Sequence, residues 1–546
     1  MGDDKSLIKS IENVFRKSWE LPALTDWGSS ITYTYGDVAT RVCFIHSLFD
    51  VLGIKPGDKI ALCDKNSSNW AISMLAIITY RAVAVPLLPD YSKQQLKMLC
   101  EHCDAKFMIG NRQLSTLWEE GECPMYLLDT EDLLTMTPNT ATDKVEEEAF
   151  HRFRINHPNG YTREDVCYEA EDPDALMLLS YTSGSTGNPK GVMLSYKSLW
   201  SNQMFASDAL PYKPGMRLLL ILPMAHMFGF SFDFLYGIML SAHLYILTTI
   251  PAPKVLIKAF AFIKPDYFLC VPLVMEKIIQ KRVLPIINKP SIRYMLKAPG
   301  FRQFICRKIR NQLSVALGGN FHSVIMGGAP LNKEVEKVLR MVKFPFTVGY
   351  GMTECGPIIT YADWRELRTG SCGKAALNME VKILSDDPQH EPGEIVAKGI
   401  NTMMGYYKNP EATQETIDKD GWLHTGDLGV IDKDGFVYIR GRKKNMLLGA
   451  NGQNIYPEEA EDQVISYSIF DECVVVQRGE KLVALVYASD LTLQAAETNR
   501  ESLDLEAIRQ EINTHLPKYC QLAQLEQRYE EFEKTPKKSI RRFLYH

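Results

Sequence analysis

The sequence predicts an α/β protein with a large N-terminal domain of stacked α/β subdomains plus a small β-rich module, followed by a small α+β C-terminal domain. Three observations predict this architecture. The 546 residues are too many for one hydrophobic core. Strand-like and helix-like patterns alternate through residues 31–90 and resume through 175–275. Short strands separated by Gly, Asp and Asn turns dominate residues 370–440.

The first alternating region contains two strand–helix units followed by a third strand. Residues 31–54 (ITYTYGDVATRVCFIHSLFDVLGI) predict a short strand and an amphipathic helix, and residues 55–64 (KPGDKIALCD) predict a turn and a strand. Residues 69–89 predict a helix followed by a buried strand. Such repeated units indicate a largely parallel sheet. Residues 111–165 are less regular, and their polar run TPNTATDKVEEE predicts an exposed connection.

The second alternating region begins with ALMLLSYTSGSTG, a strand that ends in a loop of small residues. The apolar run at 218–247 is interrupted by Pro223, His226 and Asp233, so it predicts core and not a membrane span. Residues 281–320 predict basic helices.

The last segment of about 100 residues is long enough for a separate small domain. It has its own strands, CVVVQRG and KLVALVYA, and a helix, LDLEAIRQEINTHLP. We therefore place the boundary at Gly441 to Lys444, which gives an N-terminal domain at 1–440 and a C-terminal domain at 441–546.

Composition excludes several classes of protein. The formal charge is -5 and the pI is near 6.2, which argues against a nucleic-acid partner. The charged N-terminus has no apolar h-region, so it does not predict a secretory signal. The sequence has no uninterrupted stretch of 18 apolar residues, so we expect no integral membrane segment. The 12 scattered cysteines fit a reducing, cytoplasmic compartment. Cys100 and Cys103 form a CxxC without a second pair, so they predict helix packing and not a zinc site.

The strongest chemical signal is the run SYTSGSTGNPKG at 180–191. Glycines let backbone amides approach an anion, and the hydroxyls and Lys190 add donors, so the run suits a triphosphate. Neither the spacing of a Walker A loop nor a G-x-G-x-x-G fingerprint is present.

This run resembles the phosphate-binding loop of the adenylate-forming superfamily, which includes acyl-CoA synthetases, luciferases and peptide-synthetase adenylation domains. Five further segments match that superfamily in order: LPMAHMFG, MGGAPL, GYGMTECGP, GWLHTGDLG and GRKKNMLLGANGQNIYPEE. The resemblance covers the chain from about residue 30 to the C-terminus. It implies that ATP is bound by a set of loop residues, namely Thr182, Ser183, Gly184, Ser185, Thr186, Gly187, Lys190, Gly328, Ala329, Pro330, Tyr350, Gly351, Asp427 and Arg442.

The resemblance also implies individual roles. Tyr350 faces adenine, Asp427 binds the ribose hydroxyls, Thr353 contacts the phosphates, and Glu354 binds Mg²⁺. His226 resembles a gate residue at the carboxylate end of an acyl pocket. The chemistry agrees, because attack of a carboxylate on the α-phosphorus of ATP builds charge on phosphoryl oxygens, which needs cations and oriented donors.

A mobile C-terminal domain follows from the same resemblance. Adenylation needs a cation near the α-phosphate, whereas thiolysis needs an open path for the thiol of coenzyme A. The family satisfies both by swinging the small domain, and Lys444 occupies the hinge position. Gly452 lies where the family approaches the pantetheine arm, although this loop is one residue longer than usual.

One motif departs from the family. The family's last motif is close to P-K-T-x-x-G-K-I-x-R, and its second lysine drives adenylation. This chain has KTPKKSIRR, so Ser539 falls on the catalytic position and Lys538 on the preceding glycine. Serine supplies no charge, so either Lys538 or Lys537 substitutes, or adenylation is slow, or the step is lost. A solvated basic tail is the alternative interpretation.

The expected substrate is a medium- or long-chain fatty acid, because the aromatic and Met-rich 224–240 stretch suits an apolar channel and the basic 281–320 segment resembles that of long-chain fatty acyl-CoA synthetases. An amino-acid substrate would need an acidic partner, for which Asp233 is the candidate. Three alternatives stay open: transfer to an acyl carrier protein, an acyl- or nucleotide-binding homologue without catalysis, and a Walker-type NTPase. Peripheral membrane contact fits a lipid substrate.

Overall fold

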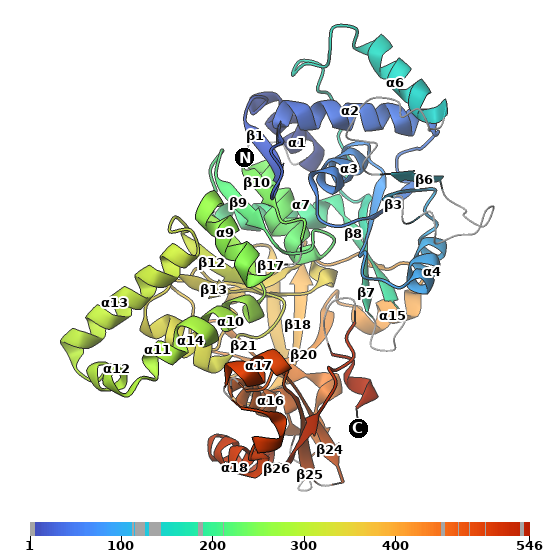
Figure 1. The fold of residues 1–546 in the computed structure, drawn as a ribbon. Coiled ribbons are helices and arrows are strands. Elements are labelled where there is room, and N and C mark those ends of the chain that lie inside the picture. Colours follow the sequence, from blue (N-terminus) through green and yellow to red (C-terminus); the bar gives the residue numbers. More distant parts are fainter. Residues whose placement is uncertain are drawn as a thin grey trace.

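The computed structural model describes residues 6–111, 114, 126–129, 144–183, 189–210, 212–249, 251–448, 454–467, 469–479, 481–496, 498–535 and 540–545. The protein is a mixed α/β structure in which two seven-stranded sheets form the main body (Figure 1). The predicted α/β class is therefore confirmed.

The first large sheet has the order β19-β8-β7-β4-β3-β5-β6. Its central strands β3 to β7 pair in parallel, whereas β8 and β19 add an antiparallel edge. The strands in spatial order are Gly405–Tyr406, Pro189–Ser195, Leu176–Ser183, Val83–Leu87, Lys59–Cys63, Phe107–Gly110 and Tyr126–Asp129. Their helices include α2 (Tyr35–Val51), α3 (Ser68–Thr79), α4 (Lys93–Cys103) and α7 (Tyr196–Ala209).

The second large sheet has the order β13-β12-β11-β9-β10-β1-β2 and is parallel except for the edge pair β1–β2. The strands in that order are Phe346–Val348, Ser323–Met326, Tyr267–Cys270, Arg217–Leu220, His243–Ile246, Pro22–Asp26 and Thr32–Thr34. The intervening helices include η2 (Gly229–Leu235), α8 (Tyr236–Met239), α9 (Pro253–Ile263), α10 (Pro272–Arg282), α11 (Leu284–Ile287), α12 (Pro290–Met295), α13 (Pro299–Ala316) and α14 (Lys333–Met341).

The β-rich module is present as predicted. It contains the antiparallel sheet β17-β18-β20-β21 and the smaller sheet β14-β15-β16. The bounds are β14 Tyr350–Gly351, β15 Ile358–Tyr361, β16 Lys374–Ala375, β17 Met379–Leu384, β18 Gly393–Gly399, β20 Leu423–Ile431 and β21 Val437–Arg442; α15 (Pro410–Thr416) lies between β19 and β20.

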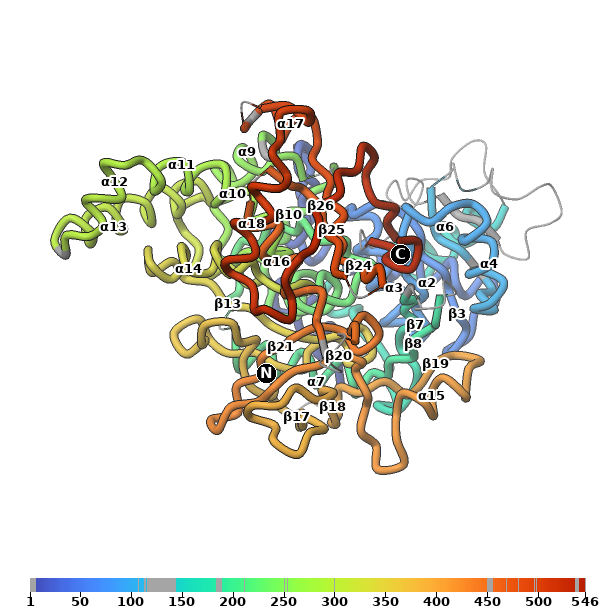
Figure 2. Tube along the Cα trace, turned by 90° about the horizontal axis from the view of Figure 1, so that it is seen from below, coloured from blue at the N-terminus to red at the C-terminus, as the bar shows by residue number. Residues whose placement is uncertain are grey.

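The last segment contains β22 (Leu447–Leu448), β23 (Asn454–Ile455), α16 (Pro457–Ser466), β24 (Glu472–Arg478), β25 (Lys481–Tyr487), α17 (Asp490–Ala495), α18 (Leu505–His515) and β26 (Leu522–Arg528). Strands β24, β25 and β26 form their own sheet. Its two apolar clusters contain only residues from 447 onward, and the segment lies in front of the rest of the chain in Figure 2. The domain boundary at Gly441 to Lys444 stays a prediction.

One sequence interpretation needs correction. The end of the polar run TPNTATDKVEEE is not a connection, because helix α6 (Lys144–Asn156) begins inside it. Ala149 and Phe153 are spaced by one helical turn and are buried, and α6 packs on α2. Two apolar positions on one face therefore outweigh the acidic character of the first turn.

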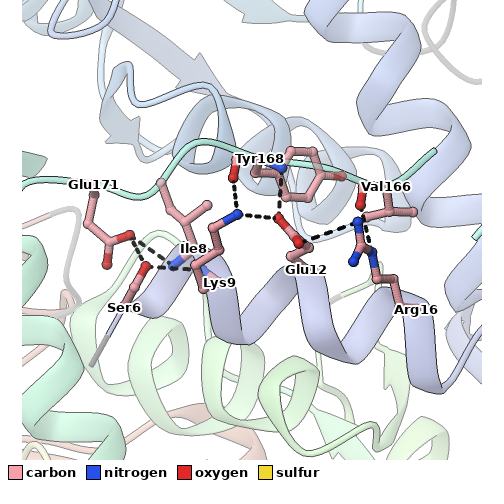
Figure 3. Close-up of polar contacts among 8 residues, drawn as sticks. All are labelled: Ser6, Ile8, Lys9, Glu12, Arg16, Val166, Tyr168 and Glu171. Carbon is pink, nitrogen blue, oxygen red and sulfur yellow. Dashed lines mark hydrogen bonds and ion pairs between the residues drawn. The ribbon is translucent and has the colours of Figure 1, made fainter. Parts of the chain in front are cut away.

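The N-terminal helix α1 (Leu7–Lys17) is fixed to a distant segment (Figure 3). The Glu171 carboxylate accepts hydrogen bonds from the backbone N–H groups of Leu7 (2.6 Å) and Ile8 (3.3 Å). Three side chains of the helix bond the same segment. Glu12 accepts from the Tyr168 N–H (2.8 Å), Lys9 donates to the Tyr168 carbonyl (2.5 Å), and Arg16 donates to the Val166 carbonyl (2.7 Å). Glu171 thus satisfies first-turn donors and complements the helix dipole.

Cys100 and Cys103 are buried on α4, which agrees with the predicted packing role. No described helix combines the length and the apolar character that crossing a membrane would need.

Candidate active site

A cleft with a cavity volume of about 1520 Å³ lies at the carboxyl ends of β9, β11, β12 and β13. Residues that follow these four strands line it, namely Leu222, Val271, Gly327 and Gly349. Ligands of open parallel sheets bind at this end of the strands because the loops converge there. The β-rich module and the last segment contribute further walls, including His424, Arg442 and Val475.

The predicted phosphate loop connects an antiparallel hairpin. Strand β7 pairs with β8 so that Thr182 lies opposite Lys190. This differs from a Walker loop, which joins a strand to a helix. Thr182 and Lys190 line the cleft. Gly184, Ser185, Thr186 and Gly187 and the side chain of Ser183 lie outside the described residues.

A chain of three hydrogen-bonded or ion-paired side chains joins two motifs that are far apart in the sequence. The Tyr350 hydroxyl donates to Asp427 Oδ2 at 2.7 Å, and Arg442 Nε lies 2.8 Å from Asp427 Oδ1. Burial raises the pKa of Asp427, whereas the Arg442 charge and the Tyr350 hydroxyl oppose that rise. Asp427 is thus a fixed acceptor beside the wall that Tyr350 and Arg442 line.

Glu354 lies in a short helical turn, Thr353–Cys355, and both Thr353 and Glu354 line the cleft. Glu354 is 7% exposed and accepts a hydrogen bond from the Tyr406 hydroxyl at 2.9 Å. The Lys190 ammonium lies 4.8 Å from the centre of the Tyr406 ring. One carboxylate at a polar cleft fits Mg²⁺, which keeps several waters and uses phosphate oxygens as its other ligands.

The turn that carries Thr353 and Glu354 is fixed by hydrogen bonds from residues that the sequence analysis did not identify. Asn202 donates from Nδ2 to the Cys355 carbonyl at 3.2 Å and accepts from the Ile358 N–H at 3.1 Å. Ser231 donates to the Gly356 carbonyl at 2.8 Å. Both side chains are fully buried. Neither belongs to a motif, so only the fold reveals their support of the turn.

Two predicted glycines have a steric role. A Cβ at Gly351 would lie 2.0 Å from the Pro357 carbonyl oxygen, so the hairpin closes only with glycine there. Gly328 has a φ of +82° at the end of β12 and lines the cleft. Ala329 and Pro330, which follow it, are exposed.

The cleft also has apolar lining residues. Phe205, Leu210, Phe232 and Leu269 are among them, and His226 lines the same cleft. The π-helix η2 begins three residues after His226 and carries Phe232 into the wall. A π-helical turn shifts the register of the side chains that follow and is frequent at functional sites.

Asp233, the candidate partner for a substrate ammonium, is 2% exposed in η2. Burial raises the pKa of Asp233 well above its usual range, which favours a neutral carboxyl. A neutral carboxyl is a poor partner for an ammonium group, so the amino-acid interpretation loses support.

Residues around the predicted hinge also line the cleft. Lys444 lines the cleft; partial desolvation lowers its pKa, and the Arg442 charge lowers it further. Arg541 and Arg542 also line the cleft. Arg542 forms two bonds to Glu461, from Nη1 to Oε2 at 2.7 Å and from Nη2 to Oε1 at 2.6 Å.

Some predicted positions are not described. Gly452, Lys537, Lys538 and Ser539 lie outside the described residues. The bridge between Lys534 and Ile540 and the cleft-lining Thr535 and Arg541 flank the lysine positions on both sides.

This fold and this cleft define a nucleotide-binding α/β enzyme. The chain belongs to the AMP-binding enzyme family of the adenylate-forming superfamily, because the profile of that family matches residues 11–407.

Relatives act on different acids. The chain is 29% identical over 474 residues to 4-coumarate–CoA ligase 4 from Arabidopsis thaliana, covering 83% of this chain and 76% of that protein. It is 28% identical over 469 residues to long-chain-fatty-acid–CoA ligase FadD15 from Mycobacterium bovis, covering 80% and 74%.

Solved structures share the fold. O-succinylbenzoate coenzyme A synthetase (MenE) from Bacillus subtilis, in complex with ATP and magnesium, superposes with a TM-score of 0.76 at 19% identity, covering 98% of each chain. ATP-bound MatB from Rhodopseudomonas palustris gives the same TM-score, identity and coverage.

Proposed function

We propose that the protein is an AMP-forming acid–CoA ligase that activates a medium- or long-chain fatty acid. The observation that carries this proposal is one cleft that is lined by both charged and apolar side chains. Lys190, Glu354 and Arg442 suit a nucleotide, and Phe205 and Leu269 suit an acyl chain. Such a cleft brings an apolar acid to a triphosphate.

In the first step the carboxylate oxygen attacks the α-phosphorus of ATP. A bond forms from that oxygen to phosphorus, the bond to the bridging oxygen of the β-phosphate breaks, and pyrophosphate leaves. Asp427 holds the ribose hydroxyls, Tyr350 lies along adenine, and Lys190 with Thr353 contacts the phosphates. Glu354 would hold Mg²⁺, which neutralises phosphate charge when it is bound. His226 stands at the carboxylate end of the acyl chain.

In the second step the thiol of coenzyme A loses its proton and its sulfur attacks the acyl carbon. The bond from that carbon to the AMP oxygen breaks, which releases acyl-CoA and AMP. Lys444 is the proposed hinge that lets the last segment exchange the adenylation cation for the thiol path. Gly452 is the proposed contact of the pantetheine arm.

Lys538 or Lys537 is the proposed adenylation cation, since Ser539 supplies none. The flanking residues Thr535 and Arg541 line the cleft, which supports the assignment of a lysine between them in the sequence. Separate alanine variants at 537 and 538, and the double variant, should slow acyl-adenylate formation and leave thiolysis of added acyl-AMP unchanged. If all three variants fold and form acyl-adenylate at the normal rate, this assignment is wrong.

The overall proposal is tested by pyrophosphate release with fatty acids of increasing length and with 4-coumarate, each with and without coenzyme A. We expect release with fatty acids, AMP as the product and acyl-CoA only when coenzyme A is present. ATP binding without pyrophosphate would identify the homologue without catalysis. Release that needs an acyl carrier protein would identify the other acceptor, and preference for 4-coumarate would reject the fatty acid.

A further inference from the structure

Helices α11, α12 and α13 project from the body of the molecule in two perpendicular views (Figures 1 and 2). We call residues 284–316 the arm. Helix α13 is fixed by one face only, since Ile305, Ile309 and Leu313 are buried and α13 packs on α9. The rest of its surface faces outward.

The arm lies within a long stretch of the sequence that has basic residues and no acidic ones. Residues 277–320 contain ten lysines and arginines and no aspartate or glutamate. Since the whole chain carries a formal charge of -5, the remaining residues carry -15. None of the ten cations forms an ion pair with a described carboxylate. An excess of cations without ion-pair partners attracts an anionic surface. The rest of the chain is acidic and is repelled by that surface, so the arm should face it.

Large apolar side chains lie among these cations. Phe301, Phe304 and Val315 are 57%, 66% and 73% exposed, and the exposed Lys308 lies between them. Their spacings of three, four and seven place all four on one face of α13, away from the buried face. At 1.5 Å per residue this stripe runs about 21 Å. Tyr294 on α12 adds a ring that is 79% exposed.

We propose that the arm docks the protein on the surface of an anionic phospholipid bilayer. Rings at the headgroup boundary with lysines and arginines beside them are the pattern of helices that lie on a membrane. A nucleic acid fits less well, because it needs a cationic groove that follows its backbone, whereas the arm projects and one member of its apolar stripe is aliphatic. The arm follows β11 and α10 in the chain, and Leu269 in β11 and Val271 directly after it line the cleft.

The test is co-sedimentation of the full chain with vesicles. The probes are phosphatidylcholine alone and phosphatidylcholine mixed with phosphatidylserine. We expect binding to the mixed vesicles only, and a steep loss as salt shortens the range of the attraction. The readout needs no catalysis, so it is independent of the proposed ligase activity: an inactive protein would still sediment.

Two arm variants and two matched controls decide the proposal. Arg307→Glu with Lys308→Glu should lower the vesicle partition coefficient at least about 30-fold, since each cation contributes roughly fivefold. Phe301→Ser with Phe304→Ser should lower it at least about tenfold. The controls change exposed residues elsewhere: Lys419→Glu with Lys433→Glu, and Leu491→Ser with Tyr529→Ser.

Unchanged thermal unfolding of each variant excludes a folding defect as the cause. The proposal is overturned if the arm variants lose no more binding than their controls, or if the protein binds phosphatidylcholine alone equally well. It is also overturned if single-stranded RNA displaces the vesicles and its own binding depends on the same four residues, because the occupant is then a nucleic acid.

Discussion

The partly buried ion pair between Glu461 and Arg542 should stabilise the last segment of the chain. Glu461 Oε1 also accepts the Val475 N–H at 2.6 Å, so the pair fixes the chain end to β24. The two side chains are only 13% and 25% exposed. Arg542→Met leaves a buried carboxylate with one backbone donor, and breaking a buried pair costs about 3–5 kcal/mol. The quarter exposure of Arg542 points to about 3 kcal/mol.

A double-mutant cycle separates the pair from its surroundings. Glu461→Met leaves the Arg542 charge and the Val475 N–H unpaired, which should cost about 2–4 kcal/mol. The double variant leaves only the N–H unpaired, at about 1–3 kcal/mol. The two single losses together therefore exceed the double loss, and the coupling should be about 4 kcal/mol.

Hydrogen exchange measured by mass spectrometry is the suitable assay. A chain of this size does not unfold in one step, whereas exchange reports the local opening of β24 and α16. The matched control is the exposed pair Glu148–Arg152 on α6, which has the same 2.7 Å separation but side chains that are 48% and 49% exposed. Its coupling should be about 0.3–0.5 kcal/mol. Equal coupling in the two pairs would refute the reasoning that burial decides the difference.

Three further predictions concern the site and the core. Gly351→Ala should abolish ATP binding in a calorimetric titration, because its Cβ meets the Pro357 carbonyl; Gly300→Ala, where nothing lies within 4 Å, should leave binding unchanged, and equal effects would contradict the steric argument. Asn202→Ala should raise KM for ATP and destabilise the protein by about 2–3 kcal/mol, since it leaves two buried backbone groups unpaired; a normal KM would remove its supporting role. Burial lowers the pKa of His46 to about 4, so the unfolded chain binds the proton first and stability should fall by about 1.4 kcal/mol per unit as pH drops from about 6.5 to 4. His46→Gln should reduce that slope in denaturant titrations at several pH values, and an unchanged slope would contradict the role of His46.

Local elements were predictable because their signals are local. The helix that begins at Tyr35 has a capping box from Thr34 and Asp37, three residues apart, and the strand at Lys59–Cys63 follows a Pro-Gly turn. The prediction for the start of α6 was wrong. Its acidic first turn resembles a connection, and only the burial of Ala149 and the packing of α6 on α2 reveal the helix.

The sequence by itself determined the family, the order of the motifs and the kinds of side chain that the chemistry needs, because these depend on residue type and on short spacings. Only the tertiary structure decided which of them meet. Tyr350 bonds Asp427 across 77 positions, Arg542 bonds Glu461 across 81, and Asn202 supports a turn more than 150 residues away. Hydrophobic periodicity is repeated every two or 3.6 residues and carries no record of such distances, which are set by how the sheets and helices pack.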